Sequence, residues 1–430
     1  MSALVKSLHP DEKVKAGKLG SNMVKAGLGI AVVFGVISVV LGSMHGDHWK
    51  RFMYSYVIGW SFIVSIAIGM LWLVLLHHLV RGRWATVVRR VAEAMTGAFP
   101  LIFIAGLGFV IPLLLGYGDL YYWAHADAKN VALNPHMVHK LGWLSPGFFA
   151  LRYVLYGVLF TGIAAYFARK SRQQDESGDQ KISDHLRAVS GPAMILYSFL
   201  TCALAFDVLM SLAPKWYSTI YGVGFWASGN VAAFSVLALI VLWLQRNGRL
   251  VHSVNEEHYH DIGKWMFSFT FFWAYTAFSQ FMLQWYGNMP EETVWYKYRM
   301  FGDWQWVSIA ILVGYWAFPF VFLMSRWTKR IVPSLVFFAV WQIAFHWLNL
   351  YWNAMPQYDW EVTFAENARL VQGPLMGPLA HHHVGLSAVD FTVWIALLGV
   401  LLVGIGRNLT GNLIPIKDPT LGMSLAHEQI

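Results

Sequence analysis

Long runs of apolar residues, separated by short polar connections, dominate the chain. Ten runs reach about 20 residues, the length that a helix needs to cross the hydrocarbon layer of a membrane. A membrane barrel would need short strands of alternating polarity, whereas segments such as VSIAIGMLWLVLL are apolar on every side. The pattern predicts an all-α polytopic membrane protein with about ten transmembrane helices, at residues 24–42, 53–78, 94–116, 147–168, 188–212, 218–244, 263–287, 304–325, 331–352 and 384–405.

The distribution of positive charge predicts the orientation. With the N-terminus inside, the inner segments hold 22 of the 31 Lys and Arg residues and the outer loops hold 8, with Arg152 inside a span. Because Lys and Arg accumulate in cytoplasmic loops, both termini are expected in the cytoplasm. No small-residue cleavage site follows the first apolar run, so its helix is expected to remain as an anchor.

One connection differs from the others in composition. The segment RKSRQQDESGDQKISDHLR is polar, charged and free of aromatic residues, which is typical of a flexible linker. The expected order along the chain is a cytoplasmic N-terminal tail (1–23), helices one to four (24–168), a cytoplasmic linker (169–187), helices five to ten (188–405) and a cytoplasmic C-terminal tail (406–430).

Composition limits the ligands and cofactors that the chain can bind. The net charge is +8, but the basic residues lie between apolar runs and do not form a patch for nucleic acid. The single cysteine, Cys202, excludes a disulfide within the chain, a cysteine-ligated iron–sulphur cluster and a haem held by two cysteines. His346 lacks a second intramembrane histidine for haem, and the adjacent histidines 381–383 point apart too much for a ready metal site. No cofactor or metal is therefore expected in this chain.

Two predicted outer loops, 118–146 and 353–383, are rich in aromatic residues. Such residues favour a docking surface for a partner outside the cytoplasm. The alternative is that the loops fold back over the helix ends. The aromatic residues are Tyr121, Tyr122, Trp123, Trp143, Tyr358 and Trp360.

Asp207 interrupts the outer half of the fifth predicted helix, where a carboxylate is costly. Arg152 lies about as far from the outer end of the fourth helix, and a cytoplasmic connection makes the two helices antiparallel neighbours. Charges inside a membrane face the bundle interior and find partners, so the sequence predicts an Arg152–Asp207 ion pair. Such a pair serves either proton transfer or helix register alone.

Other polar residues are placed at the same depth on three more helices. Gln280 and Gln284 are spaced to share one helix face, and His346 and Asp390 lie in the outer thirds of their spans. Five helices contributing polar groups to one layer predict a hydrated cavity open to the outside. Asp390 lacks an evident cationic neighbour, and an unpaired carboxylate there would exchange protons near neutral pH.

A second polar group is predicted at the inner side. It resembles the mouth of an inner proton channel, although polar residues are ordinary at a water interface. Hydroxyl groups in mid-span would bridge the two sides, although Ser and Thr also serve helix packing. The inner residues are His77, His78, Glu93, His258, His260, Asp261 and Lys264, and the bridging ones are Ser61, Ser65, Tyr197, Ser198, Thr201, Thr270 and Tyr275.

Three stretches carry a family resemblance. AFDVLMSLAPKWYSTIYGVGFWASG (205–229), HDIGKWMFSFTFFWAYTAFSQFMLQWYGNMPEETVWY (260–296) and HWLNLYW (346–352) closely resemble the F subunit of bacterial alternative complex III, a quinol:cytochrome c oxidoreductase. Most of the chain shares this likeness, and the 260–296 stretch is its most specific part. That subunit belongs with the polysulfide-reductase-type (NrfD-like) membrane subunits.

The resemblance implies an architecture and a set of partners. It implies two four-helix bundles, helices two to five and six to nine, flanked by helices one and ten, in the bacterial cytoplasmic membrane. Partners would be a related quinol-site membrane subunit, a periplasmic iron–sulphur subunit, multihaem and monohaem cytochrome c subunits, and small membrane anchors. Haem c, iron–sulphur clusters and quinol would reside in those partners, and this subunit would offer proton pathways without a redox cofactor.

Three functions follow as expectations. The first is a proton-conducting subunit that couples quinol oxidation to proton translocation, with Asp207, Arg152, His346, Asp390, Gln280 and Gln284 on the outer side and His260, Asp261, Glu93 and His78 on the inner side. The second is a structural scaffold, with or without a quinone site. The third, an independent secondary transporter, would favour interrupted helices at matching positions, which the in-span prolines Pro112 and Pro319 do not mark.

Overall fold

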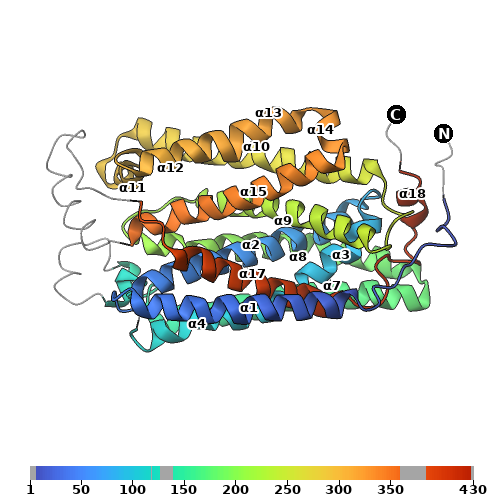
Figure 1. The fold of residues 1–430 in the computed structure, drawn as a ribbon, viewed down its shortest axis with the longest axis horizontal. Helices are drawn as coiled ribbons and strands as arrows, with labels where there is room; N and C mark the ends of the chain where they lie inside the picture. The colour runs from blue at the N-terminus through green and yellow to red at the C-terminus, as the bar shows by residue number, and fades with distance from the viewer. Residues whose placement is uncertain (1–5, 118, 126–138, 359–383, 428–430) are drawn as a thin grey trace.

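The computed structural model describes residues 6–117, 119–125, 139–358 and 384–427, and these are helical with no β-strand among them. Long helices run side by side along the longest axis (Figure 1). Within the described residues, nine helical stretches are long and apolar enough to cross a membrane, and each coincides with a predicted run. The chain is therefore a multi-pass α-helical membrane protein.

The nine stretches comprise most of the named helices. They are α1 (Leu19–Met44), α2 (Lys50–Val80), α3 (Thr86–Thr96) with α4 (Phe99–Leu114), α7 (Pro146–Ser177), α8 (Gln180–Val208) with the 3₁₀ turn η2 (Met210–Leu212), α9 (Tyr221–Arg246), α12 (Trp304–Ala310) with the π-helix η3 (Ile311–Ala317) and α13 (Phe318–Met324), α15 (Val332–Ala354) with η4 (Met355–Gln357), and α17 (Ala388–Asn408).

The remaining helices are shorter or more polar. α10 (Glu256–Gly287) is 32 residues long and covers the predicted run 263–287, but Trp, Tyr, Ser, Thr and Gln residues make its most apolar stretch less hydrophobic than those of the nine. The short helices are η1 (Tyr122–His125), α11 (Pro290–Met300), α14 (Arg326–Arg330) and α18 (Leu421–Leu425).

α2 forms the centre of the molecule. It is buried along nearly its whole length and packs against α3, α4 and α8 and also against α9, α15 and α17 (Figure 1). Every side of α2 is apolar, so it can be covered by protein on all sides. Polar groups on α2 consequently lie inside the protein, away from lipid.

Residues 169–187, predicted as a flexible linker, are almost entirely helical. α7 continues to Ser177 and α8 begins at Gln180, so only a tight turn separates the two helices, with Gly178 at φ 71°. Eight of the 19 residues in this segment are Lys, Arg or Gln, which are good helix formers in water, and polarity alone does not make a segment flexible. Gln174 donates to Ser183 across the turn at 2.6 Å.

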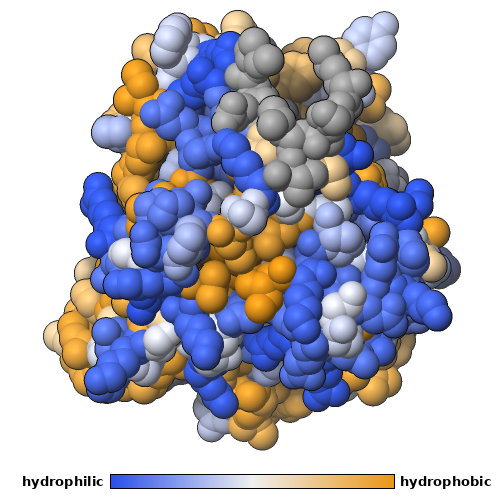
Figure 2. Space-filling model, turned by 90° about the vertical axis from the view of Figure 1, so that its right-hand side faces the viewer, coloured by the Kyte–Doolittle hydropathy of each residue, from blue (hydrophilic) through white to orange (hydrophobic). Residues whose placement is uncertain are grey.

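Both termini lie at the same end of the bundle (Figure 1). We name it the inner end, following the predicted cytoplasmic location of both termini, and the opposite end the outer end. The inner face shows mostly hydrophilic side chains around a central apolar patch (Figure 2). Parts of the two predicted outer loops, 126–138 and 359–383 with Trp360 and histidines 381–383, lie outside the described residues.

α1 and α17 pack closely through glycines. A Cβ atom on Gly399 would lie 2.5 Å from the backbone nitrogen of Ala31 and 2.7 Å from the backbone oxygen of Gly27. Small residues let membrane helices approach to this distance, where dispersion contacts hold them. Gly20 and Gly406 repeat the arrangement toward the inner end.

We expect Gly399→Val to destabilise the protein by about 3 kcal/mol, because neither backbone atom facing the new side chain can move without shifting a helix. Gly35→Val is the matched control, since a Cβ atom there meets open space. Thermal unfolding of the two detergent-solubilised variants measures the difference. Equal midpoints would mean that the α1–α17 contact contributes little to stability.

Candidate functional site

The predicted pair of Arg152 and Asp207 is confirmed. Arg152 Nε lies 2.7 Å from Oδ2 of Asp207, and Arg152 Nη2 donates to Oδ1 at 3.0 Å. Tyr156 and Trp143 donate to the same carboxylate at 2.6 and 2.9 Å. The guanidinium also lies over the rings of Trp143 and Phe148. Four donors to one carboxylate supply the hydrogen bonds that it loses on leaving water, and these contacts offset the cost of burying it.

Asp207 also borders a hollow of about 350 Å³ at the outer end. Its wall is mainly apolar and includes Trp143, Phe206 and Met210. The carboxylate faces this space while remaining paired.

The prediction that Asp390 lacks a cation is wrong. Arg51, at the start of α2, donates through Nε to Asp390 Oδ1 at 3.0 Å and forms a second contact through Nη2. Ser55 donates to the same carboxylate at 2.6 Å, and the backbone N–H of Ser387 donates at 2.9 Å in a capping box at the start of α17. Arg51 and Asp390 are 339 residues apart, so no local pattern connects them.

His346 lies in the middle of the molecule and not in an outer layer. Its Nε2 is 2.9 Å from the hydroxyl of Ser65, which sits midway along α2, and its Nδ1 is 3.4 Å from Tyr315 Oη. Tyr315 belongs to the π-helix η3 and donates to the backbone oxygen of Ser228 at 3.2 Å. π-Helical turns often occur at functional positions because they re-aim a side chain. One turn from His346, Gln342 donates to Thr270 at 2.8 Å.

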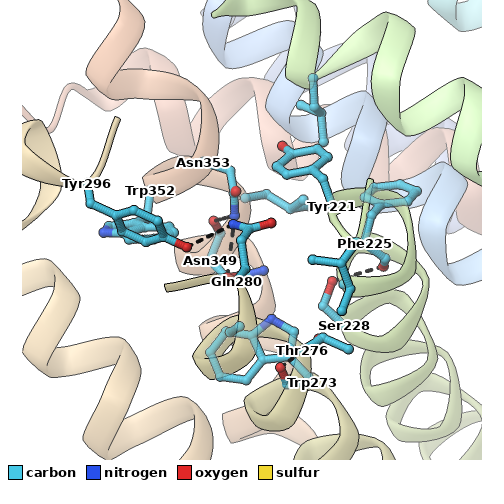
Figure 3. A pocket seen from close by; sticks show the side chains of 15 residues that line it. Tyr221, Phe225, Ser228, Trp273, Thr276, Gln280, Tyr296, Asn349, Trp352 and Asn353 are labelled. Carbon is cyan, nitrogen blue, oxygen red and sulfur yellow. Dashed lines mark hydrogen bonds between the residues drawn. The ribbon is translucent and has the colours of Figure 1, made fainter. Parts of the chain in front are cut away.

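Gln280 and Gln284 connect α10 to neighbouring segments by hydrogen bonds beside a cavity near the outer end. Gln280 accepts from Ser218 at 2.9 Å and donates to Tyr296 at 3.0 Å, and Gln284 accepts from Trp216 at 3.0 Å. The cavity, with room for a few ordered waters at about 70 Å³, is lined by apolar and polar side chains (Figure 3). The polar ones are Tyr221, Ser228, Thr276, Gln280, Tyr296, Asn349 and Asn353.

The cavity and His346 are connected through shared residues. Ser228 lines the cavity, and its backbone oxygen accepts from Tyr315, which reaches His346. Asn349 lines the cavity one turn along α15 from His346. A polar series therefore runs from the outer cavity through Tyr315 and His346 to Ser65.

Arg299, at the end of α11, binds two residues that line the outer cavity, Trp352 and Asn353. It is fully buried and donates to the backbone oxygens of Trp295, Trp352 and Asn353, with its guanidinium 3.5 Å from the centre of the Trp295 ring. No carboxylate pairs with it among the described residues. Burial lowers the pKa of Arg299 to about 9.

The predicted inner residues fall into two clusters. In the first, Glu93 is paired on both oxygens, with Arg89 Nε at 3.3 Å and Arg90 Nη1 at 3.1 Å. Arg89 also reaches Asp418 at 2.8 Å, and Arg90 reaches Asp175 at 2.6 Å. His78 lies next to this cluster and packs against Phe167. Glu93 is thus the centre of a buried ionic network.

The second inner cluster lies at the start of α10. Asp261 pairs with Lys264 and with Nε2 of His427 at 2.7 Å, and Nδ1 of His260 lies 3.4 Å from Glu257. Asn255 donates to the backbone oxygen of His427 at 3.0 Å. The C-terminal segment therefore joins both clusters, because it supplies Asp418 to one and His427 to the other.

We expect the attachment of the C-terminal segment to weaken below pH 4. Burial raises the pKa of Asp418, but Arg89 and hydrogen bonds from Thr420 outweigh this effect and hold the pKa below its usual 3.8. A lowered pKa stabilises the folded state above the unfolded value and loses that stabilisation as pH falls through the folded value. The protection factors of residues 409–427, which compare each exchange rate with the intrinsic rate at the same pH, should therefore fall as the pH drops below about 4.

Asp418→Asn is the control for this prediction. It should exchange faster than the unaltered chain at pH 5, and the gap should narrow toward pH 3. A gap that does not depend on pH would contradict the role of the Asp418 charge.

An aromatic cluster separates the central polar series from the inner clusters. Trp72 lies on α2 between Ser65 and His77, and its ring is 5.0 Å from Phe269 and 5.1 Å from Trp265. Phe234 stacks on Trp265 at 5.7 Å. This layer is apolar, so a proton route from one side to the other would need water to enter it.

The described aromatic residues of the first outer loop pack inward. Tyr121 is fully buried, donates to the backbone oxygen of Val208 at 2.9 Å and stacks on Trp123. Of the two explanations for this loop, its folding back over the helix ends fits these residues. Trp143 is half exposed and contacts Arg152.

Sequence reasoning missed several participating charges; four that lie far in sequence from the predicted residues they join or stand alone are Arg51, Arg299, Asp418 and His427. The first two stand near predicted interfaces, where a basic residue is ordinary, and the last two lie in a predicted solvent-facing tail. Asp390 gave the one usable signal, since a carboxylate in a span demands a cation somewhere.

No family model matches the chain, and no curated protein matches it either.

Proposed function

We propose that this chain is an integral membrane subunit of a respiratory quinol:cytochrome c oxidoreductase, of the kind that its sequence resembles, and that it provides proton pathways coupling quinol oxidation to proton translocation. The observation that carries the proposal is the polar series from the outer cavity through Tyr315 and His346 to Ser65. A histidine within hydrogen-bond reach of two hydroxyl groups can accept a proton on one ring nitrogen and release one from the other, carrying the positive charge as an imidazolium in between. Water in the outer cavity would deliver the proton to the Tyr315 hydroxyl, because the backbone oxygen of Ser228 only accepts a hydrogen bond.

The proposal includes the finer architecture. α10 would be the tenth span, and α2, α3–α4, α7 and α8 would form one four-helix bundle with α9, α10, α12–α13 and α15 as the other. In support, α7 contacts α4 and α8 within the first bundle, and α9 contacts α10 and α15 within the second, while α2 packs against helices of both. α1 packs mainly on α17 beside the bundles. Both termini would be cytoplasmic, in a bacterial cytoplasmic membrane.

The partners are part of the same proposal. A related membrane subunit would hold the quinol site, and periplasmic iron–sulphur and cytochrome c subunits would carry electrons through their clusters and haem c. The aromatic layer at Trp72 fits a coupling role, because a gated proton pathway needs a barrier that water crosses only at one stage of the cycle.

Purification in mild detergent tests the placement. The tagged protein should retain iron–sulphur and cytochrome subunits by mass spectrometry, with haem c absorbance in a redox difference spectrum of the same sample. A colourless preparation containing this chain alone would overturn the placement and favour an independent transporter.

A structural scaffold is the second candidate, favoured by a specific observation. Asp207, Asp390 and Glu93, the buried carboxylates at issue, are each paired with arginine. Fully paired charges fix helix positions without moving protons. His346→Phe separates the candidates: a scaffold keeps full proton coupling when the complex assembles, whereas a pathway through His346 loses it.

A further inference from the structure

A separate hollow of about 410 Å³ lies at the inner end of α2. It is bordered by the last turn of α2, the following loop, the start of α8 and the segment around Asp418. None of the polar series around His346 lines it. The hollow therefore needs an explanation of its own.

The hollow carries an excess of positive charge. Arg81, Arg83 and Arg89 line it, against the carboxylates of Asp184 and Asp418. Arg81 pairs with Asp184, and Arg89 pairs with Asp418 at 2.8 Å. Arg83 forms no ion pair in the part of the chain that the structure describes, so its charge remains available to a ligand.

Two buried histidines present unpartnered nitrogens at the same place. His77 and His78 are 5% and 7% exposed, and Nδ1 of His77 and Nε2 of His78 have no hydrogen-bond partner among the described residues. Nε2 of His77 lies 3.4 Å from the Thr86 hydroxyl. The Thr86 hydroxyl also lies 3.1 Å from the backbone oxygen of Arg83 and 2.8 Å from the Thr420 hydroxyl. In the His77 tautomer that carries its proton on Nδ1, that N–H requires an acceptor. Buried donors without acceptors are rare and point to a missing ligand or water.

The loop after α2 and the start of α8 complete the lining of the hollow. A Cβ atom on Gly82 would lie 3.1 Å from Nδ1 of His77, so any larger residue would crowd that nitrogen. α8, 29 residues long, begins at Gln180 on the rim, and Ser183 lies in its first turns. The positive end of a long helix favours an anion in front of it.

We propose that this hollow binds a phosphate group. Unpaired arginine, histidine N–H groups and a helix N-terminus are the donors that phosphate oxygens accept from. The group is either the head of an anionic membrane phospholipid or a soluble phosphate. Val80, exposed at the rim, gives an acyl chain a surface next to the head group, and basic pockets on the cytoplasmic side of membrane helices hold lipid head groups in this way.

The test uses the full-length protein, delipidated in phosphate-free buffer. Inorganic phosphate is titrated by calorimetry, and phosphatidylglycerol in mixed micelles is titrated in parallel, with diacylglycerol as the lipid that lacks phosphate. We expect saturable binding of one equivalent of phosphate or phosphatidylglycerol and none of diacylglycerol. Binding should weaken about tenfold in Arg83→Gln and in Ser183→Asp, which remove a positive charge and add a negative one.

Arg187→Gln is the matched control, because Arg187 is an exposed residue of α8 that does not line the hollow. It should leave affinity within about twofold. Binding of phosphatidylglycerol without free phosphate identifies a lipid head group, and binding of free phosphate identifies a soluble ligand. Absence of saturable binding by both, or equal weakening in Arg187→Gln, would overturn the proposal. None of these results depends on proton coupling.

Discussion

Asp207→Ala should destabilise the protein by about 3–5 kcal/mol, because it leaves the guanidinium of Arg152 buried without its counter-charge. The same change removes the acceptor of Tyr156 and Trp143. Thermal unfolding of the detergent-solubilised protein measures the loss, and retention of partner subunits on purification gives a second measure.

Two further variants test whether the loss of stability comes from the buried Arg152–Asp207 pair or from removing any negative charge. Asp184→Ala breaks the exposed pair with Arg81 and should cost less than about 0.5 kcal/mol, since solvent screens that pair. The double variant Arg152→Met with Asp207→Leu should recover part of the stability, because it removes both buried charges. If Asp207→Ala cost no more than Asp184→Ala, the buried pair would not stabilise the fold.

His346→Phe should lower proton translocation per electron at least tenfold while leaving electron transfer in the assembled complex. Phenylalanine keeps the ring volume but breaks the contacts to Ser65 and Tyr315, and proton transfer by a positioned histidine contributes about a hundredfold or more to a rate. The measurement is acidification by the reconstituted complex during quinol oxidation.

The control for His346 is His185→Phe, a substitution of the same type at an exposed position of α8. Tyr315→Phe should lower coupling in the same direction, because it removes the hydroxyl between the cavity and His346. Full coupling in an assembled His346→Phe complex would remove the polar series from the pathway and favour the scaffold.

Features carried by local composition were predictable from the sequence. Apolar runs located the nine membrane-length helices, because the thickness of the hydrocarbon layer fixes their length. The Arg152–Asp207 pair was predictable since a short connection makes its two helices antiparallel neighbours. Matched depth along adjacent helices is information that a sequence contains.

Features set by distant helices were not predictable. Arg51 meets Asp390 across 339 residues, and nothing near Asp390 in the chain indicates its partner. His346 was assigned one layer too far out, because its depth is set by packing against Ser65 on α2 and not by its distance from a helix end. The helical segment before Gly178 was mistaken for a linker because water-facing helix formers share the composition of loops.

The distance in sequence between Arg51 and Asp390 has a consequence during synthesis. At about 5–20 residues per second, α17 leaves the ribosome on the order of tens of seconds after α2. During that interval α3, α4, α8, α9 and α15 come to cover α2, but the guanidinium at its outer end still lacks the carboxylate of Asp390. The nascent chain therefore needs either interfacial water around Arg51 or an insertion factor that shields α2 until the last long helix arrives.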